Sequence, residues 1–230
     1  MKRRLGWAVV VLVVLFAVLV GYPASRVVRA RFFPKRYQVE SIALLAEYQD
    51  ATLLARAWSL PVAARFGRRV EPQQNVSVCG LASAANVFRS LGTGPTTASS
   101  VAEGTGKCRI LGYCWKGLTL DELAEVIRSK TGRKVTVLRD LTLAQFREEI
   151  AKANDADRRY IVNFHRGLLF GQGGGHHSPI GGYLADRDLV FVLDVNARYG
   201  PWLVPVERLY TAVDTVDTES RQKRGLLLIE

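Results

Sequence analysis

The sequence predicts an α+β domain with a largely antiparallel sheet, preceded by an apolar N-terminal segment. Segments with helical spacing of apolar residues dominate the first half of the domain, and most strand-like segments follow in the second half. That order is typical of folds in which helices and strands are segregated. The 230 residues are 48% hydrophobic and 23% charged, which indicates a globular chain and excludes a disordered or collagen-like one. The length fits one domain plus an appendage.

The net charge of +11 would fit a nucleic-acid-binding protein, but its distribution does not. Residues 1–36 hold eight of the 32 basic residues and no acidic one, which leaves 24 basic against 21 acidic residues over 37–230. The body of the chain is therefore nearly balanced, with a net charge of +3. We expect no nucleic-acid partner.

The N-terminal segment is long and apolar enough to cross a membrane. Leu5–Ser25 contains 21 residues without a charge, which as a helix would span about 30 Å. Trp7 and Tyr22 stand near its ends, where interfacial aromatic residues are expected. A cleaved signal sequence is the alternative, but no good small-x-small cleavage site follows, so we favour a transmembrane anchor over residues 1–25. Residues 26–37 form a basic linker, either attracted to anionic lipid or simply solvated.

A single domain is expected over residues 38–230, beginning with helices. Val39–Leu60 has a helical pattern that ends before Pro61. Cys79–Leu91 is an Ala-rich helix, and the Gly92–Pro95 cluster closes it.

Two further helices begin at threonine caps, and the strands lie mostly after them. Thr119 with Glu122 forms a capping box, and Thr142 opens a helix that extends to Lys152. Five segments have the apolar pattern of strands: Lys134–Leu138, Arg159–Phe164, Ile180–Leu184, Leu189–Val195 and Gly225–Ile229.

Cys79 is the first candidate for chemistry because it lies at the start of a helix. The unpaired N–H groups and the helix dipole there favour a thiolate, which is a nucleophile. The alternative is a small buried residue without chemical function, which is the commoner role of a cysteine before an Ala-rich helix.

His176 and His177 follow a glycine-rich run, residues 171–175, and stand at the mouth of a strand. Either histidine could act as general base for Cys79, and either alone could be a surface-loop residue. Adjacent side chains on a strand point to opposite faces, so we expect one of the two to be structural.

Asp194 ends the apolar strand that pairs, through a hairpin between Tyr183 and Val190, with the strand after the histidines. A carboxylate at the end of a buried run needs a partner, and a neighbouring histidine would suit it; a turn cap is the alternative. Cysteine, histidine and aspartate in this order are the groups that a thiol acyl-transfer site requires. Gln73 could lend its amide to an oxyanion hole.

Several motifs stand in order along the chain: Gln73 with Cys79-Gly80-Leu81-Ala82-Ser83, Gly175-His176-His177-Ser178-Pro179-Ile180-Gly181-Gly182-Tyr183, Leu193-Asp194-Val195, Ala212-Val213-Asp214-Thr215-Val216-Asp217, and Arg224-Gly225. Together they resemble phytochelatin synthase, a papain-like family of γ-glutamylcysteine dipeptidyl transpeptidases. The resemblance covers roughly residues 38–230 and is strongest over 73–92 and 160–230. It implies a papain-like cysteine peptidase fold, with the nucleophile at a helix N-terminus beside an antiparallel sheet.

By this resemblance Cys79 is the nucleophile, and His176, which follows the last glycine directly, is the base. Asp194 orients His176, and Gln73 supplies the oxyanion donor. His177 stands where the family usually has an apolar residue, so the resemblance assigns it no role.

The resemblance also implies a substrate site. Arg224, held by Asp217, resembles the pair that grips the α-carboxylate of a γ-glutamyl group, which suits the bidentate chemistry of arginine; a surface ion pair is the alternative. Gly175 lets the backbone approach a ligand. Arg198 with Tyr199 resembles an Arg-Tyr pair after the family's aspartate, although the loop here is shorter.

Cys108 and Cys114 lie in the weakly matched middle of the chain. They form either a disulfide, if the domain is extracytoplasmic, or two independent thiols. Two thiols without a nearby histidine are a thin ligand set, so no protein metal site is expected. By the resemblance, Cd²⁺ or Zn²⁺ would enter as the metal–glutathione thiolate, which is a substrate, and no cofactor is required.

The resemblance implies a membrane-anchored enzyme that cleaves the Cys–Gly bond of glutathione through a γ-glutamylcysteinyl-enzyme. Transfer to water is expected to dominate over transfer to a second glutathione, which would form phytochelatin. The alternatives are a leader-peptide-processing cysteine peptidase of the same fold and a pseudoenzyme that binds thiol peptides. We expect the catalytic domain on the periplasmic side, although three basic residues before the apolar run and five after it leave the orientation open. A homodimer is possible.

Overall fold

The computed structural model describes residues 14, 16, 20, 21, 25, 48–108, 114 and 116–230. The chain divides into two compact units, Met1–Arg36 and Tyr37–Glu230. The anchor predicted over residues 1–25 lies almost wholly outside the described residues, and the linker over 26–37 lies outside them entirely. Among the residues that are described, no helix is both long and apolar enough to cross a membrane.

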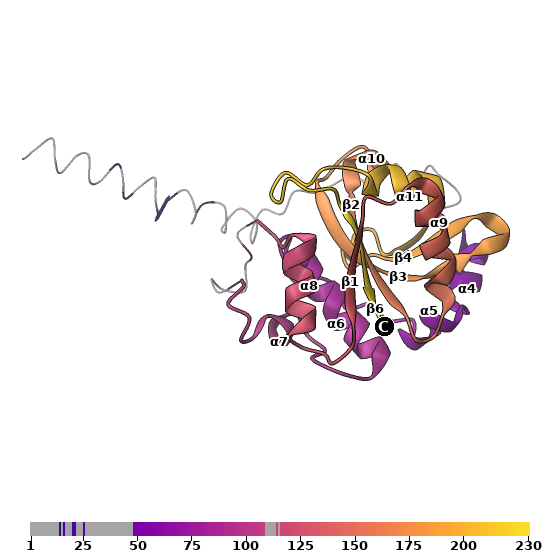
Figure 1. Cartoon of the computed structure of the whole chain (residues 1–230), viewed down its shortest axis with the longest axis horizontal. Coiled ribbons are helices and arrows are strands. Elements are labelled where there is room, and N and C mark those ends of the chain that lie inside the picture. Colours follow the sequence, from indigo (N-terminus) through magenta and orange to yellow (C-terminus); the bar gives the residue numbers. More distant parts are fainter. Residues whose placement is uncertain are drawn as a thin grey trace, which may run out of the picture. The chain divides into compact units, whose positions relative to one another are not determined.

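The second unit is built on a six-stranded sheet in which every neighbouring pair is antiparallel (Figure 1). The strand order is β1-β6-β2-β3-β4-β5, so the C-terminal strand lies between β1 and β2. The strands are β1 (Val135–Arg139), β2 (Arg159–His165), β3 (Gly175–Leu184), β4 (Leu189–Leu193), β5 (Pro201–Pro205) and β6 (Gly225–Ile229).

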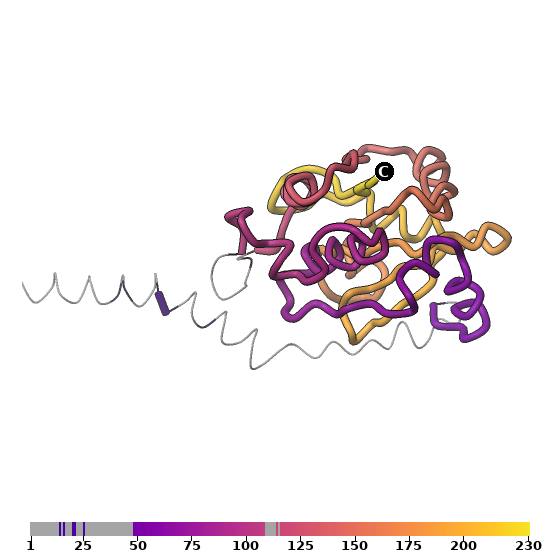
Figure 2. The backbone as a smooth tube through the Cα atoms, turned by 90° about the horizontal axis from the view of Figure 1, so that it is seen from below, coloured from indigo at the N-terminus to yellow at the C-terminus, as the bar shows by residue number. Residues whose placement is uncertain are grey.

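The N-terminal helices cover one face of this sheet. Their apolar residues pack with alternate strand residues such as Ile161, Phe191 and Leu227 in one buried cluster. In Figure 2 the purple segment that contains α6 lies against the orange strands, in agreement with the contacts between α6 and β3. These helices are α4 (Ala51–Trp58), α5 (Pro61–Arg65), α6 (Cys79–Leu91), α7 (Ala98–Ala102) and α8 (Leu120–Arg128).

The opposite face carries a second apolar cluster, centred on aromatic side chains. Trp202 is fully buried and its ring meets those of Phe164 and Phe170 edge to face. Because Val162 and Phe164 belong to this cluster and Ile161 to the first, β2 is apolar on both faces. The helices on this side are α9 (Leu143–Ala151), α10 (Arg166–Phe170) and α11 (Val206–Val213), with short 3₁₀ turns at Lys152–Asn154 and Ala185–Arg187.

The α+β prediction is confirmed, and several local predictions hold residue by residue. Helix α6 has the predicted bounds, and α8 and α9 start at the predicted caps, Thr119 and Thr142. Tyr183 pairs with Val190 across the hairpin that joins β3 to β4. These features depend on local capping and turn chemistry, which the sequence encodes directly.

The structure corrects two predicted boundaries. Residues 39–47 of the helix predicted over Val39–Leu60 lie outside the described residues. One continuous helix up to Leu60 is wrong, because Asp50 has a non-helical backbone and caps α4 by accepting from the N–H of Leu53. Strand β3 begins at Gly175 rather than Ile180, because β2 supplies pairing partners back to that glycine. This earlier start places both histidines within the sheet.

Elements over residues 98–102, 166–170 and 201–213 were not predicted. Strand β5 begins and ends on proline, which lowers strand propensity and confines the segment to an edge of the sheet. Pairing with β4 nevertheless holds it, with Trp202 opposite Val192. Tertiary packing has here overridden local preference.

Candidate active site

Cys79 is the first residue of α6 and lies 7% exposed against the sheet. The N-cap residue, Val78, provides no side-chain hydrogen bond, so the first-turn N–H groups are not satisfied by a cap and point toward the thiol end of the helix. All three cysteines are described, and Cys79 is the one outside the disulfide. The helix therefore presents a single thiol at its positive end.

His176 connects Cys79 to Asp194. Its Nε2 lies 2.9 Å from Oδ1 of Asp194, and its ring packs edge to face on Phe164 at 5.6 Å. Burial alone would raise the pKa of the Cys79 thiol, but the charge of His176 and a hydrogen bond with it, together with His177, bring that pKa well below its ordinary value. Cys79, His176 and Asp194 are thus brought together as the sequence predicts, although their catalytic roles stay predictions.

The electrostatics favour an ion pair of thiolate and imidazolium. Burial and the neighbouring Arg166 would lower the pKa of His176, but the charges of Asp194 and Cys79 and the hydrogen bond to Asp194 raise it above its ordinary value. The thiol pKa falls while the imidazole pKa rises, so each charged form stabilises the other. Such a pair is a nucleophile with its general acid already in place.

Asp194 is held by more donors than a histidine alone. Arg166 Nη2 donates to both of its carboxylate oxygens, at 2.7 and 3.0 Å, and Trp202 Nε1 and the backbone N–H of Asn196 donate at 3.1 and 2.8 Å. Burial would raise the pKa of this carboxyl, but the charges of His176 and Arg166 and these hydrogen bonds hold it well below its usual range. The carboxylate is therefore charged and fixed in direction.

Arg166 is the main site residue that sequence reasoning missed. It begins α10, is 7% exposed, and its guanidinium lies 4.3 Å from the centroid of the Tyr199 ring. The available signal was a charged residue directly after an apolar strand, since such a residue needs a counter-ion when buried. Nothing local indicates that the counter-ion is Asp194, 28 residues later.

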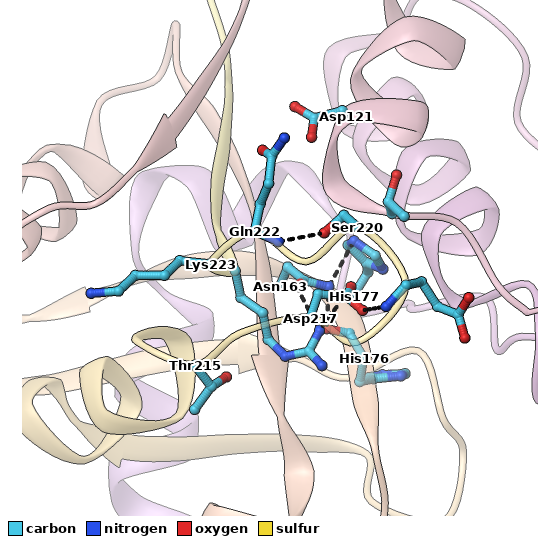
Figure 3. A network of polar contacts seen from close by, with 12 residues as sticks. Asp121, Asn163, His176, His177, Thr215, Asp217, Ser220, Gln222 and Lys223 are labelled. Atoms are coloured by element: carbon cyan, nitrogen blue, oxygen red, sulfur yellow. Dashed lines mark hydrogen bonds and ion pairs between the residues drawn. The ribbon is translucent and has the colours of Figure 1, made fainter.

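His177 projects to the other face of β3, yet it also reaches Cys79. The register pairs His176 with Phe164 and His177 with Asn163, so the two rings face opposite sides, and Figure 3 shows them pointing apart. The opposite orientation is as predicted. His177 Nδ1 nevertheless lies 3.9 Å from the Cys79 sulfur, so neither histidine is remote from the thiol.

Behind His177 lies a second buried polar chain (Figure 3). His177 Nε2 lies 2.9 Å from Nδ2 of Asn163, whose Oδ1 accepts from Arg224 Nη1 at 3.2 Å. Arg224 is 5% exposed and pairs with Asp217 at 3.0 Å. A Cβ added to Gly175 would lie 2.8 Å from Arg224 Nη1, so this glycine packs directly on the guanidinium. The predicted substrate residues Arg224, Asp217 and Gly175 thus lie together, one polar chain away from the thiol.

Gln73 and Arg198 lie on segments next to Asp194, and the contacts of their side chains do not assign them a role. The backbone N–H of Gln73 donates to the carbonyl of Val195 at 2.7 Å, which ties its segment to the residue after Asp194. Its side-chain Nε2 donates to the carbonyl of Asn75 at 2.8 Å. Arg198 is exposed in the turn after Asp194, with its backbone N–H on Oδ1 of Asn196. The oxyanion and substrate-binding roles of the two side chains stay predictions.

Of the two alternatives for the remaining cysteines, the structure has the disulfide, Cys108–Cys114. Within the described part of the chain, no group of three or more His, Cys, Asp or Glu side chains is arranged to hold a metal ion.

A cysteine at a helix N-terminus, packed on an antiparallel sheet that carries histidine and aspartate, defines the papain-like cysteine peptidase class of fold. The fold is similar to that of a putative C39-like peptidase from Bacillus anthracis, with a TM-score of 0.52 and 12% identity over 72% of this chain and 95% of that one. The family model described as phytochelatin synthase matches residues 45–226. The chain belongs to the phytochelatin synthase family.

Curated relatives carry consistent names. "Glutathione gamma-glutamylcysteinyltransferase 2" of Arabidopsis thaliana is 31% identical over 185 residues, which is 69% of this chain and 37% of that protein. "Glutathione gamma-glutamylcysteinyltransferase" of Schizosaccharomyces pombe is 28% identical over 127 residues, 54% of this chain and 31% of that protein. The chain thus spans about a third of the length of these relatives.

Proposed function

We propose that this protein is a thiol acyltransferase that acts on glutathione, with Cys79 as its nucleophile. The observation that carries the proposal is the buried chain from Cys79 through His176 to Asp194, whose shifted pKa values favour a thiolate beside an imidazolium. The names of the relatives support glutathione as donor substrate and γ-glutamylcysteinyl as the group transferred.

In the first half-reaction the thiolate of Cys79 attacks the carbonyl carbon of the Cys–Gly peptide bond. His176 gives its proton to the glycine nitrogen as the carbon–nitrogen bond breaks, so glycine leaves with a neutral amine. The product is a γ-glutamylcysteinyl thioester on Cys79. Asp194 holds the ring of His176 and stabilises its charged form before the proton is transferred.

In the second half-reaction the neutral His176 accepts a proton from the incoming nucleophile. Water gives γ-glutamylcysteine, and the α-amino group of a second glutathione gives a phytochelatin; both regenerate the thiolate and the imidazolium. We expect water to be the main acceptor. Gln73 would donate to the oxyanion in both steps, since Asn75 uses one of its two amide hydrogens.

Arg224 is the proposed contact for the α-carboxylate of the γ-glutamyl group. Its Nε is buried and makes no hydrogen bond, and Asp217 and Asn163 fix the orientation of its fork. A buried guanidinium with an unused donor gains strongly from a carboxylate. Arg198 would add a contact from the exposed turn. Cd²⁺ or Zn²⁺ would act by forming a glutathione thiolate complex that serves as acceptor.

We further propose that residues 1–25 anchor the protein in a membrane, with the domain on the oxidising, periplasmic side. The Cys108–Cys114 disulfide supports this placement, because disulfides persist in oxidising compartments. Alkaline extraction of membranes, followed by protease treatment of intact spheroplasts, tests it. Release by alkali would contradict the anchor, and protection from protease would contradict the periplasmic orientation.

The activity is tested by incubating the 230-residue chain with glutathione, with and without Cd²⁺, and following products by mass spectrometry. We expect release of glycine and γ-glutamylcysteine, with few longer oligomers, and loss of all products in Cys79→Ser. Asp186→Asn, on the exposed ion pair with Arg56, is the matched surface control and should behave as the unaltered chain. No glycine release under either condition would contradict the glutathione assignment, and cleavage of a double-glycine leader peptide instead would favour a peptidase.

A further inference from the structure

His177 contacts the nucleophile but has no part in the mechanism above. Its side chain is 2% exposed, and its Nδ1 lies 3.9 Å from the Cys79 sulfur, within reach of a hydrogen bond to sulfur. What this nitrogen does to the thiolate depends on whether it carries the ring proton. A bare nitrogen would repel the thiolate, whereas an N–H would stabilise it.

The partners of Asn163 fix the direction of its amide. Arg224 has only donors, so the atom of Asn163 that meets Arg224 Nη1 at 3.2 Å must be the carbonyl oxygen. On the other side, the amide nitrogen lies 3.4 Å from the backbone carbonyl of His176, which has only acceptor capacity. Both contacts independently place the Nδ2 donor toward His177.

This direction determines the tautomer of His177. Asn163 Nδ2 donates to His177 Nε2 at 2.9 Å, so Nε2 must offer a lone pair and cannot carry a proton. A neutral imidazole without a proton on Nε2 carries it on Nδ1. The Nδ1–H group is the one that faces the Cys79 sulfur.

The surroundings hold the His177 ring in this place. Ser83 Oγ, on α6, donates to the backbone carbonyl of His177 at 3.0 Å. Gly80, also on α6, lies beside the ring: a Cβ there would be in ordinary contact with His177 Nδ1 at 3.7 Å and tight against the side chain of Leu123 at 3.2 Å. The helix that carries the thiol and the strand that carries the imidazole are therefore locked together at this point.

We propose that His177 is a second hydrogen-bond donor to the Cys79 thiolate, and that Asn163 is a positioning residue that keeps the proton on Nδ1. The inference rests on the proposed role of Cys79 as nucleophile. The thiolate is then stabilised from both faces of β3, by the His176 imidazolium on one side and by a neutral N–H on the other. The second donor stays in place after His176 has given up its proton to the leaving glycine.

The titratable and charged groups around this chain are few among the described residues. His176 and His177, both on β3, face Cys79. Arg224, directly before β6, faces Asn163 and is itself paired with Asp217. Burial, and then the charge of Arg224, lower the pKa of His165 at the end of β2. A change in the ionisation of Cys79 after substitution of His177 is therefore attributable to the removed donor.

The test is the rate at which iodoacetamide alkylates Cys79, measured against pH on the folded 230-residue chain with its disulfide intact. His177→Phe removes the donor and keeps an aromatic ring; we expect the midpoint of the profile to rise by about one pH unit, which is about tenfold slower alkylation below the midpoint. His177→Asn, whose amide nitrogen can occupy the place of Nδ1, is the rescue variant and should restore most of the rate. An unchanged profile in His177→Phe would overturn the proposal.

Asn163→Leu tests the positioning role. It should shift the profile in the same direction as His177→Phe, and in the His177→Phe background it should add nothing, because Asn163 acts through His177. Additive shifts would show that Asn163 acts by another route. Thermal unfolding of each variant separates loss of structure from loss of the donor.

The tautomer can also be read without any change at His177. In the ¹⁵N-histidine-labelled Cys79→Ala chain, the nitrogen shifts should identify His177 as a neutral ring with the proton on Nδ1. A proton on Nε2 would overturn the proposal even if a variant fails to fold. Neither alkylation nor NMR uses glutathione, so failure of this inference is distinguishable from failure of the proposed function.

Discussion

Asp194 is a buried carboxylate on which donors from four residues converge. They come from β3, α10, β5 and the turn after Asp194 itself, so the aspartate joins segments that are distant in sequence. A buried ion pair of this kind is costly to disrupt from one side, because the remaining charge has no counter-ion. Asp194 therefore matters both to His176 and to the local fold.

We predict that Asp194→Asn lowers both activity and stability. Glycine release should fall by about 10²–10⁴-fold, because His176 loses the partner that holds its tautomer and its charge. The free energy of unfolding should fall by about 3–5 kcal/mol, because Arg166 stays buried without its anion. Urea unfolding and glycine release measure the two effects. A variant with ordinary stability and activity would show that Arg166 and His176 do not depend on Asp194.

The pH dependence of the rate should reflect the pair Cys79 and His176. The pKa of the thiol is lowered, so the nucleophile is already charged well below the range where a free cysteine ionises. The pKa of the imidazole is raised, so the general acid keeps its proton above the range of a free histidine. The rate of glycine release should rise as the pair loses its first proton and fall as it loses its second.

A profile of kcat/KM between pH 4 and 10 tests this expectation, with two apparent values that belong to the pair. A single rise near the pKa of an ordinary cysteine would mean that the ion pair does not form. Stability should depend on pH through the same two groups. Because the pKa of His176 is raised in the folded state, its contribution to the free energy of unfolding is lost as pH rises through that pKa; because the pKa of Cys79 is lowered, its contribution is lost as pH falls through that pKa.

The start of β3 is the element that builds the site. Pairing with β2 from Gly175 onward forces the two histidines to opposite faces, toward Phe164 and Asn163 respectively. The first residue of β3, Gly175, also packs against the guanidinium of Arg224, the residue directly before β6. The start of this one strand thus positions both histidines beside Cys79 and packs against Arg224, the proposed contact for the substrate carboxylate.

We predict that Gly175→Ala weakens use of glutathione. The added methyl group would lie 2.8 Å from Arg224 Nη1 and 3.0 Å from its Cζ, so the guanidinium has to move. Because a hydrogen bond to a charged group contributes about 1.5–3 kcal/mol, kcat/KM should fall at least about tenfold, mainly through KM.

Gly174→Ala is the matched control, because a Cβ there would meet nothing within 4 Å. Steady-state glycine release against glutathione concentration distinguishes the two variants. Equal behaviour of both would count against Arg224 as the carboxylate contact.

At the scale of the molecule, the sheet has a separate apolar cluster on each face. The site lies where buried polar residues replace apolar ones: Asn163 on β2, His177 on β3 and Arg224 directly before β6. The Cys108–Cys114 disulfide lies in the connection between α7 and α8, and the backbone N–H of Cys114 donates to Oγ of Ser77 at 3.1 Å. The proposed mechanism uses neither of its sulfur atoms, so we expect the disulfide to act on stability.

We predict that Cys108→Ser with Cys114→Ser lowers the free energy of unfolding by about 2 kcal/mol, the chain-entropy value for so short a loop. Activity below the unfolding transition should be kept. In the unaltered chain, alkylation after unfolding but without reduction should label Cys79 alone. Labels on all three cysteines would contradict the disulfide and, with it, the support for an oxidising compartment.

Local sequence patterns were enough to predict the helix that carries Cys79, the caps of α8 and α9, the hairpin of β3 and β4, and the order of cysteine, histidine and aspartate. These follow from capping, turn chemistry and apolar period, which act between residues close in the chain. The family resemblance rested on the segments around Cys79, the histidines and Asp194, and on two further motifs at residues 212–217 and 224–225.

Three contacts could be known only from the folded structure. Arg166 holds Asp194, His177 also reaches the thiol, and Asn163 joins His177 to Arg224. The physical reason is that a buried polar group must find partners in space, and strand pairing brings those partners from residues far apart in the chain. Alternation along β3 assigns each histidine to a face, but the partner on that face depends on the register with β2 and on how α6 packs above it.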